Sequence, residues 1–198
     1  WTPSFRAEAF MASAAEIVRF WRDAGPKFWF VKDETFDGRC RTFEAEHHAA
    51  ARGELGAWEM DAEGAMALLI LLDQLPRNIF RNSPHAFATD GLAQAVAARA
   101  IERGFDAATD SALRVFFYMP FEHSEDFSDQ DWSVSLMDNR LPATGKEFAV
   151  HTRAHREIIR RFGRFPFRNK ALGRVSSADE EAFMSQGGYG SVVRELDG

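Results

Sequence analysis

The segment of residues 65–80, AMALLILLDQLPRNIF, constrains the fold more than any other part of the chain. It is apolar on nearly every side of a helix, so protein must cover it from several directions. It is also shorter than the roughly 18 residues that a membrane-spanning helix requires. Pro76 lacks a backbone N–H and is expected to bend or break the helix. The segment therefore predicts a central helix surrounded by other helices.

Most other segments carry apolar residues at the three-to-four spacing of amphipathic helices, and polar–apolar alternation of strand length is hard to find. Further helices are predicted at about residues 5–22, 33–52, 84–103, from 110, 128–137, 146–162 and shortly after 177. Capping signals precede several of them: Asp61, Ser83 before Pro84, Ser128, and Ser177 with Glu180. We predict an all-α fold, a single domain of residues 1–198 forming an antiparallel array of about eight helices, with a loose tail after QGGYG.

Composition narrows the classes of function. The chain has 198 residues and a net charge of −6, which argues against a nucleic-acid or membrane-surface partner. Cys40 is the only cysteine, so an internal disulfide is excluded and a reducing, cytoplasmic location is expected. His151 and His155 are four residues apart, but the arginines around them would repel a cation, and no metal site is expected. Phosphate-binding glycine loops and nucleophile elbows are absent, and we expect no cofactor.

Polar residues interrupt the apolar central segment. Asp73, Arg77 and Arg81 are spaced by four residues, so they lie along one face of a continuous helix, with Gln74 and Asn78 one step around it. Burying a charge costs several kcal/mol unless it is paired. These residues therefore either form a structural ion-pair network or line a wet cleft.

A second polar block, EHSED at residues 122–126, follows the apolar run VFFYMPF. A carboxylate near an imidazole can orient the ring and hold its proton near neutral pH. His123 is therefore a candidate general base, with Glu122 assisting it. The acidic residues that follow are also typical of the first turn of a helix.

The third polar block is strongly basic. Residues 151–174 hold seven Arg and one Lys against the single acid Glu157, which indicates either an anion-binding wall or ion pairs with other helices. Its loop RFGRFPFRN, residues 161–169, can clamp a phosphate or carboxylate while its rings stack on a planar group. The candidate ligand-binding residues here are His155, Arg156, Arg164, Arg168 and Asn169.

Five blocks together resemble a known family: residues 71–81, 85–90, 116–126, 129–134 and 155–174, supported by residues 29–65. They resemble the signature blocks of the bacterial domain of unknown function 924 family. The resemblance implies an all-α domain related to tetratricopeptide-like folds and implies no established activity. The family's blocks fall on Asp73, Gln74, Pro76, Arg77, Asn78, Arg81, Glu122, His123, Ser124, Asp129, Gln130, His155, Arg156, Arg164, Pro166, Arg168 and Asn169. The family pattern FPHRN has Phe167 here in place of its histidine.

Three hypotheses of function remain open. In the leading one, a groove lined by the three blocks binds a small anionic molecule or an acidic peptide end. In this hypothesis the bound anion is held by Arg77, Arg81, Arg156 and Arg168. Asp73 and Glu122 orient these arginine side chains. The second is a hydrolase or transferase that uses His123 with Glu122 in the same groove. The third is a structural or protein-interaction module whose polar blocks are buried ion-pair networks.

Overall fold

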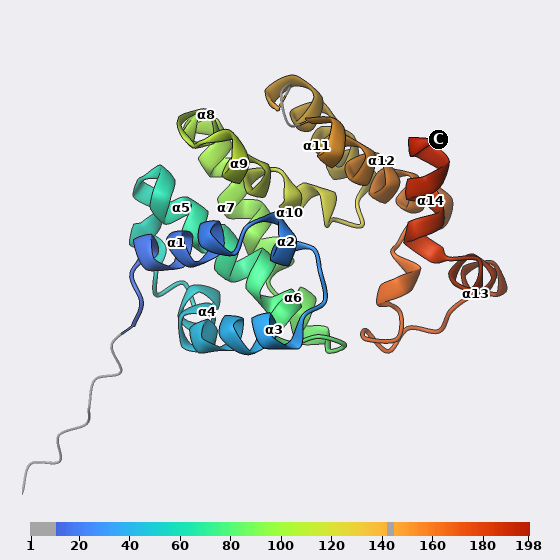
Figure 1. Ribbon diagram of the computed structural model, residues 1–198, viewed down its shortest axis with the longest axis horizontal. Coiled ribbons are helices and arrows are strands. Elements are labelled where there is room, and N and C mark those ends of the chain that lie inside the picture. The colour runs from blue at the N-terminus through green and yellow to red at the C-terminus, as the bar shows by residue number, and fades with distance from the viewer. Residues whose placement is uncertain (1–10, 142–144) are drawn as a thin grey trace, which may run out of the picture.

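The computed structural model describes residues 11–141 and 145–198, in which every regular element is helical (Figure 1). The all-α prediction is confirmed. The chain is divided more finely than the predicted array of about eight helices, because several helices are single turns. The α-helices are α1 Ala14–Ala24, α2 Pro26–Trp29, α3 Glu34–Cys40, α4 Glu44–Ala51, α5 Ala62–Leu69, α6 Leu75–Ile79, α7 Asp90–Glu102, α8 Phe105–Ala108, α9 Ser111–Arg114, α10 Met119–Glu122, α11 Phe127–Arg140, α12 Gly145–Phe162, α13 Ala178–Ser185 and α14 Gly188–Asp197.

The apolar segment at residues 65–80 lies at the centre of the molecule, as predicted. Every side chain from Ala65 to Leu75 is buried, and α5 packs against both α1 and α7. The helix does not break at Pro76. Instead a π-helical segment, Ile70–Gln74, joins α5 to α6, and the N–H of Leu75 donates to the carbonyl oxygen of Ile70. The wider turn accommodates the proline without a chain break, and such π segments are frequent at functional sites.

Local capping rules account for several helix starts. Asp61 accepts from the Gly64 N–H, and Ser177 forms the predicted capping box with Glu180. The prediction for Ser128 is wrong, because Asp126 accepts from the Ser128 N–H and the helix starts at Phe127. Its charged carboxylate favours the helix N-terminus.

Two other predicted helices are subdivided. Residues 33–52 contain α3 and α4 with a 3-10 turn between them, and residues 84–87 form a 3-10 turn before α7. The start of the helix predicted at residues 5–22 lies outside the described residues. The loose tail predicted after QGGYG is wrong, because α14 packs along α12 and buries Val192.

The described residues form two apolar clusters. The larger one surrounds α1, α5 and α7. The smaller one consists of Ala154, Ile158, Ile159, Phe165, Phe183 and Val192, from α12 to α14 and the connection after α12. In Figure 1, α11 to α14 lie to one side of the body formed by α1 to α10. The polar blocks of the sequence meet between these two parts.

Candidate functional site

The π-helical segment places Asp73 against His123, which directly follows α10. Asp73 is fully buried, and its Oδ1 and Oδ2 lie 2.8 and 3.0 Å from His123 Nδ1. Burial alone raises the pKa of Asp73, but the charges of His123 and Arg77 and the hydrogen bonds outweigh burial and lower it to about 2. Burial and Arg77 lower the pKa of His123, against the opposing effect of Asp73. At neutral pH the pair is therefore a carboxylate and a neutral imidazole.

A second carboxylate–imidazole pair joins α10 to α12. Glu122 Oε1 lies 2.9 Å from His155 Nδ1, and Glu122 Oε2 accepts from the Thr152 hydroxyl at 2.8 Å. Thr152 and His155 are three residues apart on α12, so they share the face that meets Glu122. Burial raises the pKa of Glu122, but His155, His123 and Thr152 outweigh it, and the pKa is lowered overall.

The two imidazoles face one another across the site. Their ring centroids are 6.1 Å apart and their planes are inclined by 72°. Each Nδ1 lies against oxygens that only accept, a carboxylate in both cases and also the His151 carbonyl for His155. Nδ1 is therefore the protonated nitrogen of each neutral ring. Nε2 carries the lone pair of the ring in that neutral form, and neither Nε2 has a hydrogen-bond partner among the residues described in the structure.

Two arginines adjoin the Asp73 pair. Arg77 is paired with two carboxylates: its Nη1 lies 3.3 Å from Asp73 Oδ1, and it donates twice to Asp90, at 3.0 Å each. Arg168 is buried, with 6% of its surface exposed. Its Nη1 lies 3.4 Å from Asp90 Oδ2, and its Nε has no partner within the described ranges. Burial and the nearby Arg77 lower the pKa of Arg168 to about 10, so it remains charged at neutral pH.

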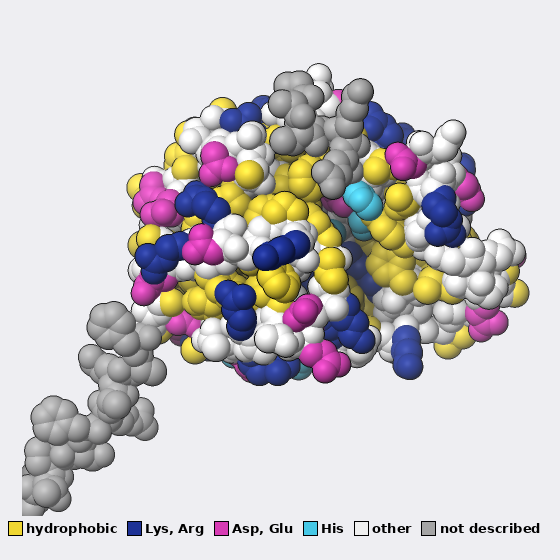
Figure 2. Space-filling model, in the orientation of Figure 1, with side chains coloured by type: hydrophobic (Ala, Val, Ile, Leu, Met, Phe, Trp, Pro, Cys, Tyr) yellow, Lys and Arg dark blue, Asp and Glu magenta, His cyan; other side chains and the backbone are white. Residues whose placement is uncertain are grey.

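Aromatic rings complete this site. Arg168 Cζ lies over the rings of Phe87 and Phe165, at 4.6 and 4.5 Å from their centroids. The Phe165 ring also packs edge-on against His155, at 5.4 Å, and Tyr189 packs against His155 at 4.8 Å. Figure 2 shows a hollow between the two parts of the molecule in which histidine and arginine side chains lie beside apolar ones. We call these residues the paired-histidine site: Asp73, Arg77, Asp90, Glu122, His123, Thr152, His155, Phe165 and Arg168.

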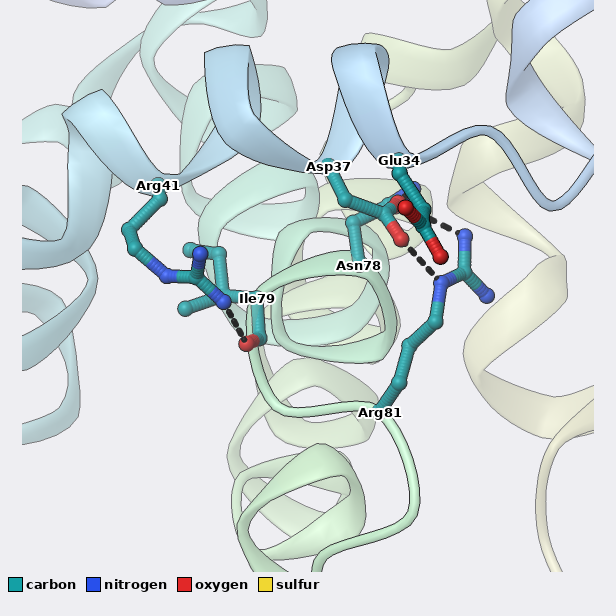
Figure 3. A pocket seen from close by; sticks show the side chains of 6 residues that line it. All are labelled: Glu34, Asp37, Arg41, Asn78, Ile79 and Arg81. Carbon is teal, nitrogen blue, oxygen red and sulfur yellow. Dashed lines mark hydrogen bonds and ion pairs between the residues drawn. The ribbon is translucent and has the colours of Figure 1, made fainter.

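Two predicted site residues lie elsewhere. Asn78 and Arg81 both hold Asp37 of α3, Asn78 at 2.8 Å and Arg81 through two hydrogen bonds (Figure 3). Together with Glu34, Arg41 and Ile79 they line a separate pocket of about 320 Å³. Helix α6 ends at Ile79, so Arg81 does not continue the face that carries Asp73 and Arg77.

The remaining predicted residues have structural surroundings. Gln74 donates to Asp73 and so supports the site directly. Arg156 is paired with the exposed Asp131. Arg164 and Asn169 both donate to Glu180 at the start of α13, which fixes the loop after α12.

Sequence reasoning missed several members of the paired-histidine site. Asp90 is 17 residues from Asp73 and begins α7, where its acidic side chain suggests only a helix start. Thr152 could have been found from its i,i+3 spacing to His155. His123 was expected to act with Glu122, but the structure pairs it with Asp73, and Glu122 with His155. Neighbouring residues on a helix point in different directions, which explains the exchange.

No group of three or more His, Cys, Asp and Glu side chains within residues 11–141 and 145–198 is arranged to hold a metal ion. Among the described helices, none combines the length and the apolar character needed to cross a membrane.

The fold and the site define an all-α protein with two carboxylate–imidazole pairs between its helical clusters. The chain belongs to the family described as bacterial protein of unknown function (DUF924), whose model matches residues 17–188. It is similar to the solved structure of the protein of unknown function ATU0120 from Agrobacterium tumefaciens. The two are 46% identical with a TM-score of 0.83, over 88% of this chain and 97% of that one. No curated protein is significantly similar to the chain. The tetratricopeptide-like arrangement stays a prediction.

Proposed function

We propose that the protein is a hydrolase or transferase that performs acid–base chemistry on a small anionic molecule in the paired-histidine site. The observation that carries this proposal is the arrangement of His123 and His155: both Nδ1 atoms are held by buried carboxylates, and both Nε2 atoms lack a partner among the described residues. A carboxylate on Nδ1 fixes the tautomer and strengthens the Nε2 lone pair as a base. Two such rings on one site supply a base and, after protonation, an acid.

Arg168 supports the binding of an anion beside these imidazoles. The other three arginines expected to hold the anion, Arg77, Arg81 and Arg156, are each paired with a carboxylate. Arg168 makes one long contact, and its buried Nε has no partner among the described residues. A buried charge with unused donors is costly without a partner, and an anionic substrate would supply it.

Turnover measurements on histidine variants test the proposal. The probes are p-nitrophenyl esters of acetate and phosphate and the bis(p-nitrophenyl) phosphate diester. We expect hydrolysis of at least one ester class above the buffer rate. His123→Asn and His155→Asn should each lower it on the order of 10²- to 10⁴-fold. The control is His48→Asn, because His48 is an exposed histidine near Glu44. No hydrolysis of any probe, or equal rates in all variants, contradicts the proposal.

One observation favours a structural role as the second candidate. Arg77 is enclosed by Asp73 and Asp90 and ties α6 to α7, as an ion-pair network would. On this reading Arg77→Ala destabilises the fold on the order of 3 kcal/mol because it leaves carboxylates unpaired, while His123→Asn and His155→Asn leave the rate of ester hydrolysis unchanged. The two histidine variants therefore distinguish the candidates.

A further inference from the structure

We infer that Tyr189 is a positioning residue for His155 and that it fixes the direction in which Nε2 of this imidazole points. The inference rests on the proposed function, because His155 is one of the two rings assigned there to acid–base chemistry. It brings the last helix of the chain into the paired-histidine site. Three features carry it: the packing of the His155 ring, the hydrogen bond that holds Tyr189, and the anchoring of α14 on α12.

The His155 ring is held at one atom by hydrogen bonds and elsewhere by aromatic rings. Its Nδ1 lies 2.9 Å from Glu122 Oε1 and 2.9 Å from the His151 carbonyl oxygen. The χ2 torsion of histidine is broad, so these contacts alone tolerate a range of ring tilts, and packing determines where Nε2 points. Tyr189 packs at 4.8 Å with an inclination of 50°, and Phe165 packs edge-on at 5.4 Å. Tyr189 has the nearer centroid of the two.

A hydrogen bond to a second histidine holds Tyr189 in this position. The Tyr189 hydroxyl lies 2.5 Å from His151 Nδ1, and the two rings are nearly parallel, inclined by 12° with centroids 5.9 Å apart. His151 and His155 are four residues apart on α12 and share one face of the helix, so the Tyr189 ring spans both. Burial and the charge of Glu122 raise the pKa of Tyr189, so its hydroxyl remains protonated over the pH range of histidine chemistry.

Helix α14 is anchored on α12 next to Tyr189. Gly187 and Gly188 have φ values of 108° and 52°, a turn that glycine adopts at low cost and that starts α14 directly before Tyr189. Val192 follows Tyr189 by three residues, is fully buried and belongs to the smaller apolar cluster. Tyr189 and Val192 therefore lie on the face of α14 that packs against α12.

Steady-state kinetics on Tyr189 variants test the inference with whichever p-nitrophenyl ester the wild type hydrolyses. Tyr189→Leu removes the aromatic ring beside His155 and should lower kcat about 10-fold, while KM changes less than about 2-fold. Tyr189→Phe keeps the ring but loses the hydrogen bond to His151, and it should lower kcat only about 3-fold. The matched control is Glu195→Gln, which breaks the exposed ion pair of α14 with Arg161 on α12 and should leave kcat unchanged. Wild-type kcat in Tyr189→Leu overturns the inference.

Nitrogen spectra of the two imidazoles separate positioning from a general loss of packing. The chemical-shift difference between the two ring nitrogens is largest when a neutral histidine holds a single tautomer. In Tyr189→Leu this difference should shrink for His155, because a ring that tilts exchanges its hydrogen-bond partners, and it should keep its wild-type value for His123. An unchanged difference for His155 overturns the inference, and so does a change of equal size in both rings.

A second variant keeps the inference testable if Tyr189→Leu fails to fold. His151→Ala removes the partner of the Tyr189 hydroxyl but keeps the backbone carbonyl that His155 Nδ1 contacts. It should lower kcat about 3-fold, as Tyr189→Phe does, and the two changes together should cost no more than either alone. In that case, wild-type kcat in both single variants overturns the inference.

The inference and the proposed function can fail separately. If esters are hydrolysed through His123 and His155 but Tyr189→Leu is as fast as the wild type, the inference alone is wrong. If no ester is hydrolysed but Tyr189→Leu changes the nitrogen spectrum of His155 alone, Tyr189 still orients that ring and the catalytic proposal is wrong.

Discussion

Replacing Asp73 by asparagine removes the negative charge at the centre of the buried polar cluster. Asp73 is fully buried, accepts from His123 Nδ1 at 2.8 Å and lies 3.3 Å from Arg77 Nη1. Asparagine keeps the size of the side chain but resembles the protonated acid, so the variant loses the stability that ionisation supplies. The pKa of Asp73 is lowered from 3.8 to about 2. At about 1.4 kcal/mol per unit of pKa, Asp73→Asn should cost on the order of 2 to 3 kcal/mol at neutral pH.

The pH dependence of this loss provides a second check. Because the pKa of Asp73 is lower in the folded state, its contribution is complete above pH 3.8 and is lost as the pH falls through about 2. Urea unfolding followed by circular dichroism, from neutral pH down to about pH 3, measures the free energy of unfolding of both proteins. The difference in the free energy of unfolding between the wild type and Asp73→Asn should become smaller below pH 3.8.

A surface variant serves as the control for Asp73→Asn. Asp131→Asn breaks the exposed ion pair with Arg156 and should cost less than about 1 kcal/mol. The reasoning is refuted if Asp73→Asn costs no more than Asp131→Asn at neutral pH. It is also refuted if the gap between wild type and Asp73→Asn stays constant as the pH falls through the range in which Asp73 titrates.

Three further predictions concern catalysis and packing. Burial and a nearby guanidinium lower the pKa of His123 below its ordinary 6.5, so kcat/KM for any ester hydrolysed should fall on the acid side with a midpoint below pH 6.5. A midpoint above that value would exclude His123 as the base. Glu122→Gln should lower the same rate at least about 10-fold by releasing His155 from its fixed tautomer; steady-state kinetics at pH 8 measure this, and an unchanged rate argues against a role for the second pair. Gly64→Ala places a Cβ 2.1 Å from a backbone carbonyl oxygen and should cost at least about 2 kcal/mol in urea unfolding. The Cβ that Gly91→Ala adds has no neighbour within 4 Å, and this substitution should stabilise α7 by about 0.5 kcal/mol. Equal changes in the free energy of unfolding for the two substitutions would contradict the close packing at Gly64.

The all-α fold class and several helix starts could be predicted from the sequence because they depend on residues close together in the chain. The carboxylate of Asp61 caps α5 through a neighbouring N–H, and the sequence shows both partners. The π-helical segment before Pro76 could not be predicted, since the same residues are compatible with a kink, a break or a π turn and packing selects among them. Helix α14 was missed because its glycines oppose a helix, whereas burial of Val192 against α12 favours one.

The candidate site shows the same division between local and distant information. The sequence identifies Asp73 and His123 as polar residues in or beside apolar runs and His155 as part of a basic block, but not which carboxylate meets which imidazole. Asp73 and His123 are 50 residues apart, and only tertiary packing decides this pairing. Burial separates Arg168 from the other arginines of its basic segment, and the sequence carries no signal for that difference.

The tautomers of His123 and His155 are the property on which the proposed chemistry most directly depends. Two-bond ¹H–¹⁵N correlation spectra at about pH 8 identify the protonated ring nitrogen, and His123→Asn and His155→Asn assign the signals. We expect both rings to carry their proton on Nδ1 and to leave Nε2 unprotonated. A proton on Nε2 of either ring at that pH would contradict the assignment of the two carboxylate–imidazole pairs as a base and an acid.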